Sequence, residues 1–82
     1  MSYEKYGTFN GKVYDDRHGG PFDRGSADSY YDRPRNPHYY VGATGQSDRV
    51  LTLEEDQLEA YNAGYDWNEK YGEKKDWGYD DY

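Results

Sequence analysis

A long helix is predicted by residues 52–71, TLEEDQLEAYNAGYDWNEKY. Thr52 and Glu55 fit a capping box, in which the Thr52 side chain caps the first turn and Glu55 reaches back to the Thr52 amide. Acidic side chains fill the first turn, where the helix dipole favours negative charge. Gly72 is a typical helix stop. We therefore expect a helix over residues 53–71.

A shorter helix is predicted by residues 22–31, FDRGSADSYY, which follow a Gly-Gly-Pro sequence. Proline is well tolerated in the first turn of a helix. Phe22, Ser26 and Tyr30 recur at the spacing of one helical face. Arg33 precedes a second proline, and the residue before a proline is disfavoured in helices. The short helix is therefore expected to end before this point.

Small residues four positions apart occur in both predicted helices. Gly25 and Ser29 form one pair, and Ala60 and Gly64 form the other. Residues without bulky side chains let two helix backbones approach closely, although the same glycines also suit a kink or a hinge. We expect an antiparallel helical hairpin over residues 21–72. The residues expected along its seam are Phe22, Tyr30, Tyr31, Leu58, Tyr61 and Tyr65.

The rest of the chain is predicted to be irregular. Asn10-Gly11 is favoured in type I′ turns, so that residues 1–20 form either a β-hairpin or a flexible lead-in. Residues 34–50 contain two prolines and two glycines and are predicted to form a long loop. Residues 73–82 alternate acidic and aromatic side chains, and we expect a flexible tail or one that folds back on the core. The predicted fold is mainly α, one small domain with flexible ends.

The apolar inventory limits the core that 82 residues can build. The chain has three Leu, three Val, two Phe and two Trp but no Ile, so its twelve Tyr must supply much of the core. Without cysteine, neither a disulfide nor a thiolate metal site can brace the fold. No apolar run approaches the roughly 20 residues that span a membrane. We expect a cytoplasmic protein that does not contact membranes.

The charge of the chain is divided unevenly. The net charge is −7, yet residues 1–50 contain seven Lys or Arg and seven Asp or Glu, so the excess lies in residues 51–82. An acidic surface favours basic protein surfaces, although it can also serve only to keep a protein dissolved. We therefore expect a small non-catalytic interaction protein whose acidic helix and tail dock on a basic partner. The residues expected to make this contact are Glu55, Glu59, Asp66, Trp77 and Tyr79.

A local basic excess stands in residues 33–40, RPRNPHYY. Cationic groups interleaved with aromatic rings are typical of surfaces that stack on exposed bases and pair with phosphates. The alternative is a structural loop whose tyrosines pack inward. If the segment binds RNA or a ribosome, the residues expected to do so are Arg24, Arg33, Arg35, His38, Tyr39 and Tyr40.

Catalytic chemistry is not indicated by the sequence. It contains no phosphate-binding glycine loop, no serine nucleophile elbow and no HExxH zinc motif. Asp15, Asp16, His18 and Asp23 could in principle hold a divalent cation, but their spacing matches no known site. We therefore expect neither an enzyme nor a cofactor nor a metal.

Three short motifs resemble the ribosome modulation factor family. They are residues 24–27 (RGSA), 31–33 (YDR) and 59–65 (EAYNAGY), and the likeness extends over about residues 22–68. The resemblance implies a helical hairpin and a role in inactivating bacterial ribosomes. Residues 20–31 also resemble short proteins of bacteria and tailed phages, which suggests a phage or bacterial modulator acting on a host protein.

The chain departs from that family in three ways. Asp32 stands where the family has glycine, no cysteine occurs in the linker, and the family is basic whereas this chain is acidic. Because basic residues are what neutralise ribosomal RNA phosphates, the departure in charge favours the protein-binding function over the ribosomal one. Whether the chain forms oligomers stays open, although exposed tyrosines are common at interfaces.

Overall fold

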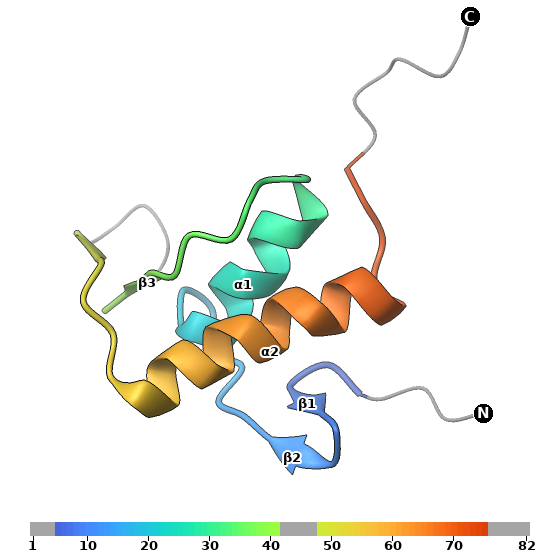
Figure 1. The fold of residues 1–82 in the computed structure, drawn as a ribbon, viewed down its shortest axis with the longest axis horizontal. Helices are drawn as coiled ribbons and strands as arrows, with labels where there is room; N and C mark the ends of the chain where they lie inside the picture. Colours follow the sequence, from blue (N-terminus) through green and yellow to red (C-terminus); the bar gives the residue numbers. More distant parts are fainter. Residues whose placement is uncertain (1–4, 42–47, 76–82) are drawn as a thin grey trace, which may run out of the picture.

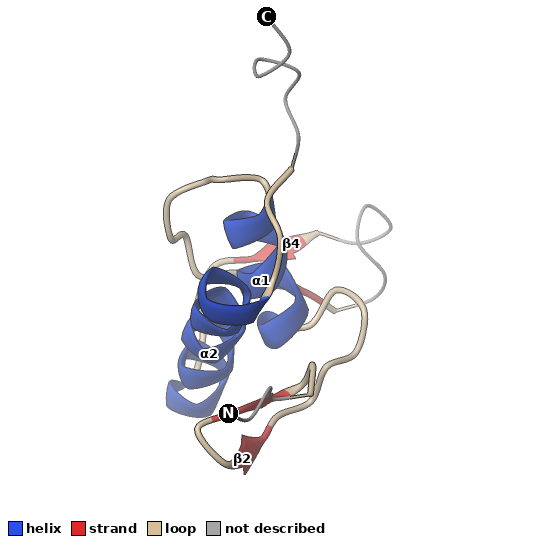
Figure 2. Ribbon diagram, turned by 90° about the vertical axis from the view of Figure 1, so that its right-hand side faces the viewer, coloured by secondary structure: helices blue, strands red, loops and turns tan. Residues whose placement is uncertain are grey.

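The protein, seen in a computed structural model, is described over residues 5–41 and 48–75 (Figure 1). Two helices are flanked by two small antiparallel strand pairs, so the fold is a compact mixture of helix and strand rather than mainly α (Figure 2). The elements in order are β1 (Thr8–Phe9), β2 (Lys12–Val13), α1 (Pro21–Tyr30), β3 (Tyr39–Tyr40), β4 (Arg49–Val50) and α2 (Glu55–Tyr71). Of the predicted lead-in (residues 1–20) and tail (residues 73–82), residues 1–4 and 76–82 lie outside the described residues.

Of the two alternatives left open for the N-terminal segment, the structure has the β-hairpin. Thr8 pairs with Val13 and Phe9 pairs with Lys12. Asn10 has φ 53° and the following glycine has φ 79°, so both central residues adopt the left-handed conformation that a type I′ turn requires. A hairpin this short is marginal alone, and here its Phe9 packs against the helices.

The helix boundaries were predicted well at three of four ends. Helix α1 ends at Tyr30, and α2 ends at Tyr71 with Gly72 as its C-cap. The start of α2 was wrong by two residues, because Glu54 rather than Thr52 is the N-cap. Glu54 and Gln57 form the capping box, with the Glu54 amide donating to Gln57 Oε1 at 2.8 Å.

Close packing of the two helices through their small residues is confirmed. A Cβ atom added to Gly25 would overlap the carbonyl oxygen of Tyr61, and one added to Gly64 would overlap the carbonyl oxygen of Phe22. Each glycine therefore meets the backbone of the opposite helix. Only residues without a side chain allow this approach, so the pair of glycines sets where the helices cross.

The helices cross instead of forming the predicted antiparallel hairpin. Ser29, near the end of α1, bonds to Glu69 Oε2 at 2.7 Å and to Asn68 Nδ2 at 3.0 Å, near the end of α2. The C-terminal ends of both helices thus lie on the same side (Figure 1). The long connection over residues 31–54 permits this arrangement, because it can return along the helices before α2 begins.

The crossing explains which predicted seam residues are buried. Phe22 and Tyr61 are completely buried beside the glycines, and Tyr65 is half-buried. The prediction that three further residues lie in the seam was wrong. Tyr30, Tyr31 and Leu58 lie beyond the crossing and are exposed. The core consists of Phe22, Ala60, Ala63 and Trp67, against which Tyr6, Phe9, Tyr14 and Tyr71 pack. Tyrosines thus supplement the core, as the thin apolar inventory required.

The predicted long loop over residues 34–50 contains a short strand pair, formed by β3 and β4. Tyr39 pairs with Val50 and Tyr40 pairs with Arg49, which corrects the prediction of a continuous loop. Aromatic and β-branched residues favour this extended pairing. The Tyr40 amide also donates to the Gly19 carbonyl at 2.7 Å, which ties β3 to the start of α1. Residues 42–47, between the two strands, lie outside the described part of the chain.

Candidate binding sites

A buried polar network lies beside the helix crossing. The Tyr61 hydroxyl donates to Asp28 Oδ2 and accepts from the Asn36 amide at 2.9 Å. The Asp28 carboxylate is 3% exposed, and the Arg33 guanidinium lies 3.4 Å from its other oxygen. Burial and the Asp28 carboxylate raise the pKa of Tyr61. A buried charge thus has both a cation and a hydroxyl as partners, as such charges require.

His38 is buried in the same network and holds an arginine in place. Arg24 Nε donates to His38 Nε2 at 3.2 Å, and His38 Nδ1 lies 2.6 Å from the Asn36 carbonyl oxygen. Because an arginine can only donate, Nε2 accepts and Nδ1 carries the proton that bonds Asn36. His38 thus orients Arg24 through the bond at its Nε2.

These side chains line a pocket of about 200 Å3, which we call the arginine pocket. Its walls come from α1, from the connection after it and from β4. The lining residues are Arg24, Asp28, Arg33, Pro34, Asn36, His38, Tyr40 and Arg49. The structure thus brings together four of the six residues predicted from the basic-aromatic segment. The sequence analysis did not identify Arg49. The structure brings Arg49 to the pocket by pairing it with Tyr40 in the β3–β4 strand pair.

Arg35 and Asp66 were predicted to contact different partners, but they contact each other. Arg35 also donates to Asn62 Oδ1 at 3.0 Å, and its guanidinium lies 4.4 Å from the centre of the Tyr65 ring. The pair ties the connection to α2. Neither residue lines the arginine pocket, and Tyr39 lines a different cleft.

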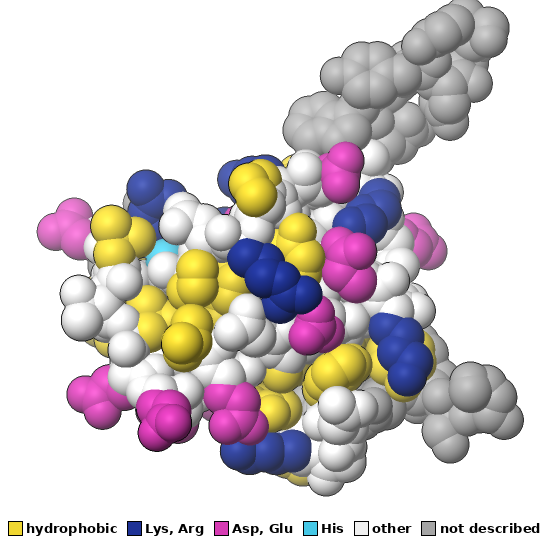
Figure 3. Space-filling view, in the orientation of Figure 1, with side chains coloured by type: hydrophobic (Ala, Val, Ile, Leu, Met, Phe, Trp, Pro, Cys, Tyr) yellow, Lys and Arg dark blue, Asp and Glu magenta, His cyan; other side chains and the backbone are white. Residues whose placement is uncertain are grey.

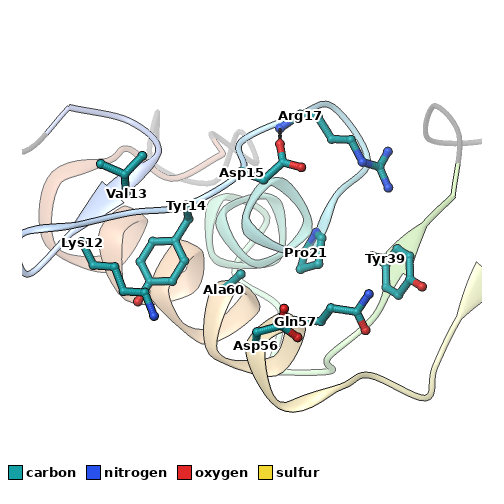
Figure 4. Close-up of a pocket in the computed structure, with 10 residues that line it drawn as sticks. All are labelled: Lys12, Val13, Tyr14, Asp15, Arg17, Pro21, Tyr39, Asp56, Gln57 and Ala60. Carbon is teal, nitrogen blue, oxygen red and sulfur yellow. Dashed lines mark hydrogen bonds between the residues drawn. The ribbon is translucent and has the colours of Figure 1, made fainter.

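A larger cleft of about 400 Å3 lies between the N-terminal hairpin, β3 and the first turns of α2 (Figure 4). The sequence did not reveal it, because its walls come from four separate segments. Tyr14 and Tyr39 stand toward opposite ends, with Pro21 and Ala60 between them (Figure 4). The lining residues are Lys12, Val13, Tyr14, Asp15, Arg17, Pro21, Tyr39, Asp56, Gln57 and Ala60.

The two cations of this cleft are satisfied internally. Lys12 bonds Glu59 at 2.7 Å, and Arg17 Nη2 donates to the Tyr40 carbonyl at 2.7 Å. The Tyr14 hydroxyl also donates to Glu59 at 2.7 Å. Burial and the Glu59 carboxylate raise the pKa of Tyr14 to about 12, and these two bonds hold the pKa of Glu59 below its usual range. Glu59, predicted to face a partner, is thus used within the fold.

The first turn of α2 retains uncompensated negative charge. Glu55 and Asp56 are exposed, and no cation pairs with them in the part of the chain that the structure describes. Leu58, which is 41% exposed, lies one turn along the same helix. Acidic side chains line the lower left edge of the molecule beside hydrophobic ones, where α2 begins (Figures 1 and 3). Trp77 and Tyr79, the other predicted contacts, lie outside the described residues.

No family model, curated protein or solved structure matches the chain. The resemblance to the ribosome modulation factor family therefore stays a prediction.

Within residues 5–41 and 48–75, no three His, Asp or Glu side chains gather into a group that could hold a metal ion. Asp23, one of the residues weighed as a ligand, instead accepts hydrogen bonds from Tyr6 and from the Gly19 amide. Neither described helix has the length and apolar character needed to span a membrane.

Proposed function

We propose that the chain is a small non-catalytic interaction protein that docks on a basic segment of a partner protein. The observation that supports this proposal is the pair of uncompensated acids in the first turn of α2, Glu55 and Asp56, of which Asp56 also lines the cleft. The resemblance noted above suggests that the protein is a phage or bacterial modulator of a host protein. The contact surface consists of the cleft and the first turn of α2, and we call it the acidic surface.

The chemistry of the acidic surface selects a lysine or arginine side chain. Pro21 and Ala60 offer an apolar floor to the hydrocarbon stem, while the carboxylate of Asp56 attracts the charged end. The rings of Tyr14 and Tyr39 are suited to a cation. Leu58 is exposed on the same helix two residues after Asp56, so the partner that we propose for α2 is a helix with one basic and one apolar face.

The test uses an amphipathic peptide of Lys and Leu in a helical repeat, titrated into the protein and followed by NMR. The double variant Glu55→Lys and Asp56→Lys should bind it roughly tenfold more weakly than the wild type. Glu73→Lys is the matched control, since it changes the charge of an exposed acid beyond the other end of α2. Affinity should also fall with salt. Equal weakening by the control, or peptide-induced shifts away from the cleft, would overturn the proposal.

The contribution of the acidic tail needs a separate variant. The chain should be truncated after Lys75, because the Lys75 amide donates to the Tyr30 carbonyl at 2.6 Å and Lys74 donates to the Ser29 carbonyl at 3.0 Å. Truncation at this point removes the predicted contacts Trp77 and Tyr79 and leaves those bonds intact. We expect weaker peptide binding, and unchanged affinity would restrict the contact to the acidic surface.

A second candidate function is an RNA- or ribosome-associated factor. The observation that favours it is the meeting of Arg24, Arg33 and His38 in the arginine pocket. Affinity capture from a bacterial lysate, with and without nuclease, separates the two functions. Recovery of ribosomal proteins that nuclease abolishes, and that Arg33→Glu weakens, would favour the RNA function. A single stoichiometric basic protein that resists nuclease would favour docking through the acidic surface.

A further inference from the structure

The arginine pocket concentrates positive charge in an acidic protein. Arg24, Arg33 and Arg49 supply three guanidinium groups against the single carboxylate of Asp28, a local net charge of +2. The chain as a whole has a net charge of −7. Three arginines converging on one concavity repel one another, so the arrangement indicates a ligand that would neutralise them.

The donor groups of this pocket are largely available. Arg24 uses Nε to bond His38, and Arg33 uses Nε against Asp28. The terminal Nη groups of both arginines, and the whole guanidinium of Arg49, have no hydrogen-bond partner among the described residues. Paired terminal N–H groups of arginine match the oxygens of a phosphate in a two-pronged contact.

Two of the arginines are held in place before any ligand arrives. The guanidinium of Arg24 lies 5.5 Å from the centre of the Tyr40 ring and is bonded to His38, which is 2% exposed. That of Arg33 lies 4.8 Å from the centre of the Tyr31 ring. Ordering a long side chain opposes binding by about 0.5–1.5 kcal/mol, and prior ordering removes much of that penalty. His38 thus acts as a positioning residue.

The size of the pocket limits the ligand. About 200 Å3 is below the roughly 300–1,000 Å3 of pockets that enclose drug-sized molecules. The space suits a compact tetrahedral anion better than a whole nucleotide. The Asp28 carboxylate does not block it, because Asp28 is 3% exposed and its oxygens are occupied by Tyr61 and Arg33.

We propose that the arginine pocket binds a phosphate dianion, either free inorganic phosphate or the terminal phosphomonoester of a larger molecule. The proposal is independent of docking through the acidic surface, which uses other residues on other segments. Arg24 and Arg33 grip the anion from the inner wall, and Arg49 closes over it from β4. The side chains that recognise the anion are thus supplied by segments far apart in the sequence.

The first experiment titrates inorganic phosphate into the full chain by calorimetry, with chloride added to equal ionic strength in the reference. Saturable binding is expected, and Arg49→Gln should weaken it roughly tenfold through the loss of one charged donor. Arg49→Lys keeps the positive charge but lacks the paired N–H groups of arginine, so its affinity for phosphate should be intermediate. Lys70→Gln is the control for charge alone, because Lys70 lies on the exposed face of α2. Equal weakening by Lys70→Gln would overturn the proposal.

Circular dichroism would show whether a variant unfolds. In that case, a second measurement tests the proposal on the wild-type protein. In the wild-type protein, the guanidinium NMR signals of Arg24, Arg33 and Arg49 should shift with phosphate, while that of Arg35 should not. Arg35 is the internal reference because it is paired with Asp66 outside the pocket. Shifts spread over all the arginines, or none at all, would contradict a specific site.

The source of the phosphate is distinguished with short RNA. A tetranucleotide with a 5′-phosphate is compared with the same tetranucleotide lacking it. Binding of the phosphorylated form alone supports a phosphomonoester, and binding of inorganic phosphate alone supports the free anion. Binding of both RNAs with equal affinity, or of no phosphate probe, would overturn the proposal.

Discussion

The helix crossing has one side that faces the β1–β2 hairpin and another that faces the connection over residues 31–54. On the first side, Tyr6 packs edge-on against Phe22 and Trp67, with both pairs of ring centres 5.1 Å apart. On the second side, the buried groups are polar and are joined by hydrogen bonds. They are Asp28, Ser29, His38 and Asn68.

The difference shows how a chain with few apolar residues stabilises both sides of the helix crossing. The hairpin side gains stability from burying rings, which tolerate small changes of geometry. The connection side depends on satisfying each buried donor and acceptor, and an unsatisfied group there costs about 1–3 kcal/mol. Each side also presents a different concavity. The cleft next to the hairpin has acids at its rim, whereas the pocket under the connection is lined with arginines.

The largest expected effect comes from breaking the crossing that both sides share. In Gly25→Ala the new Cβ would overlap the Tyr61 carbonyl, so the helices must separate. We expect a loss of more than about 3 kcal/mol in unfolding free energy, enough to unfold much of the protein. Thermal unfolding followed by circular dichroism measures this loss.

Gly20→Ala is the control for the same substitution elsewhere. Gly20 has φ −76°, which alanine adopts readily, and its Cβ would meet Arg17 Cγ at 3.1 Å and the Arg17 carbonyl oxygen at 3.3 Å, contacts far looser than the overlap at Gly25. We expect a change within about 1 kcal/mol. If both variants were equally stable, the glycine contacts would not determine the crossing.

The crossing was predictable because its signal is local, whereas its direction was not. Gly25 and Gly64 are visible in the sequence as small residues within helical patterns. Which ends of the helices meet depends on the bonds of Ser29 with Asn68 and Glu69, and no periodicity specifies those pairings. The Asn10-Gly11 hairpin was predictable for the same local reason.

A smaller effect should distinguish the two sides through matched tyrosine variants. Tyr61→Phe removes the hydroxyl that donates to Asp28 and accepts from Asn36, and therefore leaves buried groups with fewer partners. We expect a loss of about 1–3 kcal/mol in unfolding free energy. Tyr6→Phe removes a half-buried hydroxyl that bonds Ser26 at 2.9 Å, and it should cost less. Chemical denaturation measures both, and an equal or larger loss for Tyr6→Phe would contradict the comparison.

The candidate sites were predictable only in part, since charge pairing joins distant segments. Arg24, Arg33 and His38 were found because cations among aromatic residues form a local pattern. Arg35 was assigned to the same site, but Asp66 on α2 neutralises it, and the sequence offers no sign of that contact. Arg49 was missed because it stands alone in a polar stretch and reaches the pocket only through the β3–β4 pairing.

The smallest expected effect compares one exposed carboxylate on each side. Lys74 and the Ser29 hydroxyl hold the pKa of Glu69 below its usual range, and Lys12 and Tyr14 do the same for Glu59. A lowered folded pKa means that the stabilisation is present at neutral pH and is lost as pH falls from 4.5 through the folded value.

Glu69→Gln should lower the unfolding free energy by under about 1 kcal/mol after solvent screening, and it should weaken the dependence of stability on pH in the acid range. Glu59→Gln should perturb the curve less, because Glu69 alone accepts a bond from a completely buried hydroxyl. The test measures the denaturation midpoints of both variants between about pH 3 and 7, a range that brackets carboxylate titration. A larger effect of Glu59→Gln would mean that the hairpin side, and not the connection side, depends more on its hydrogen bonds.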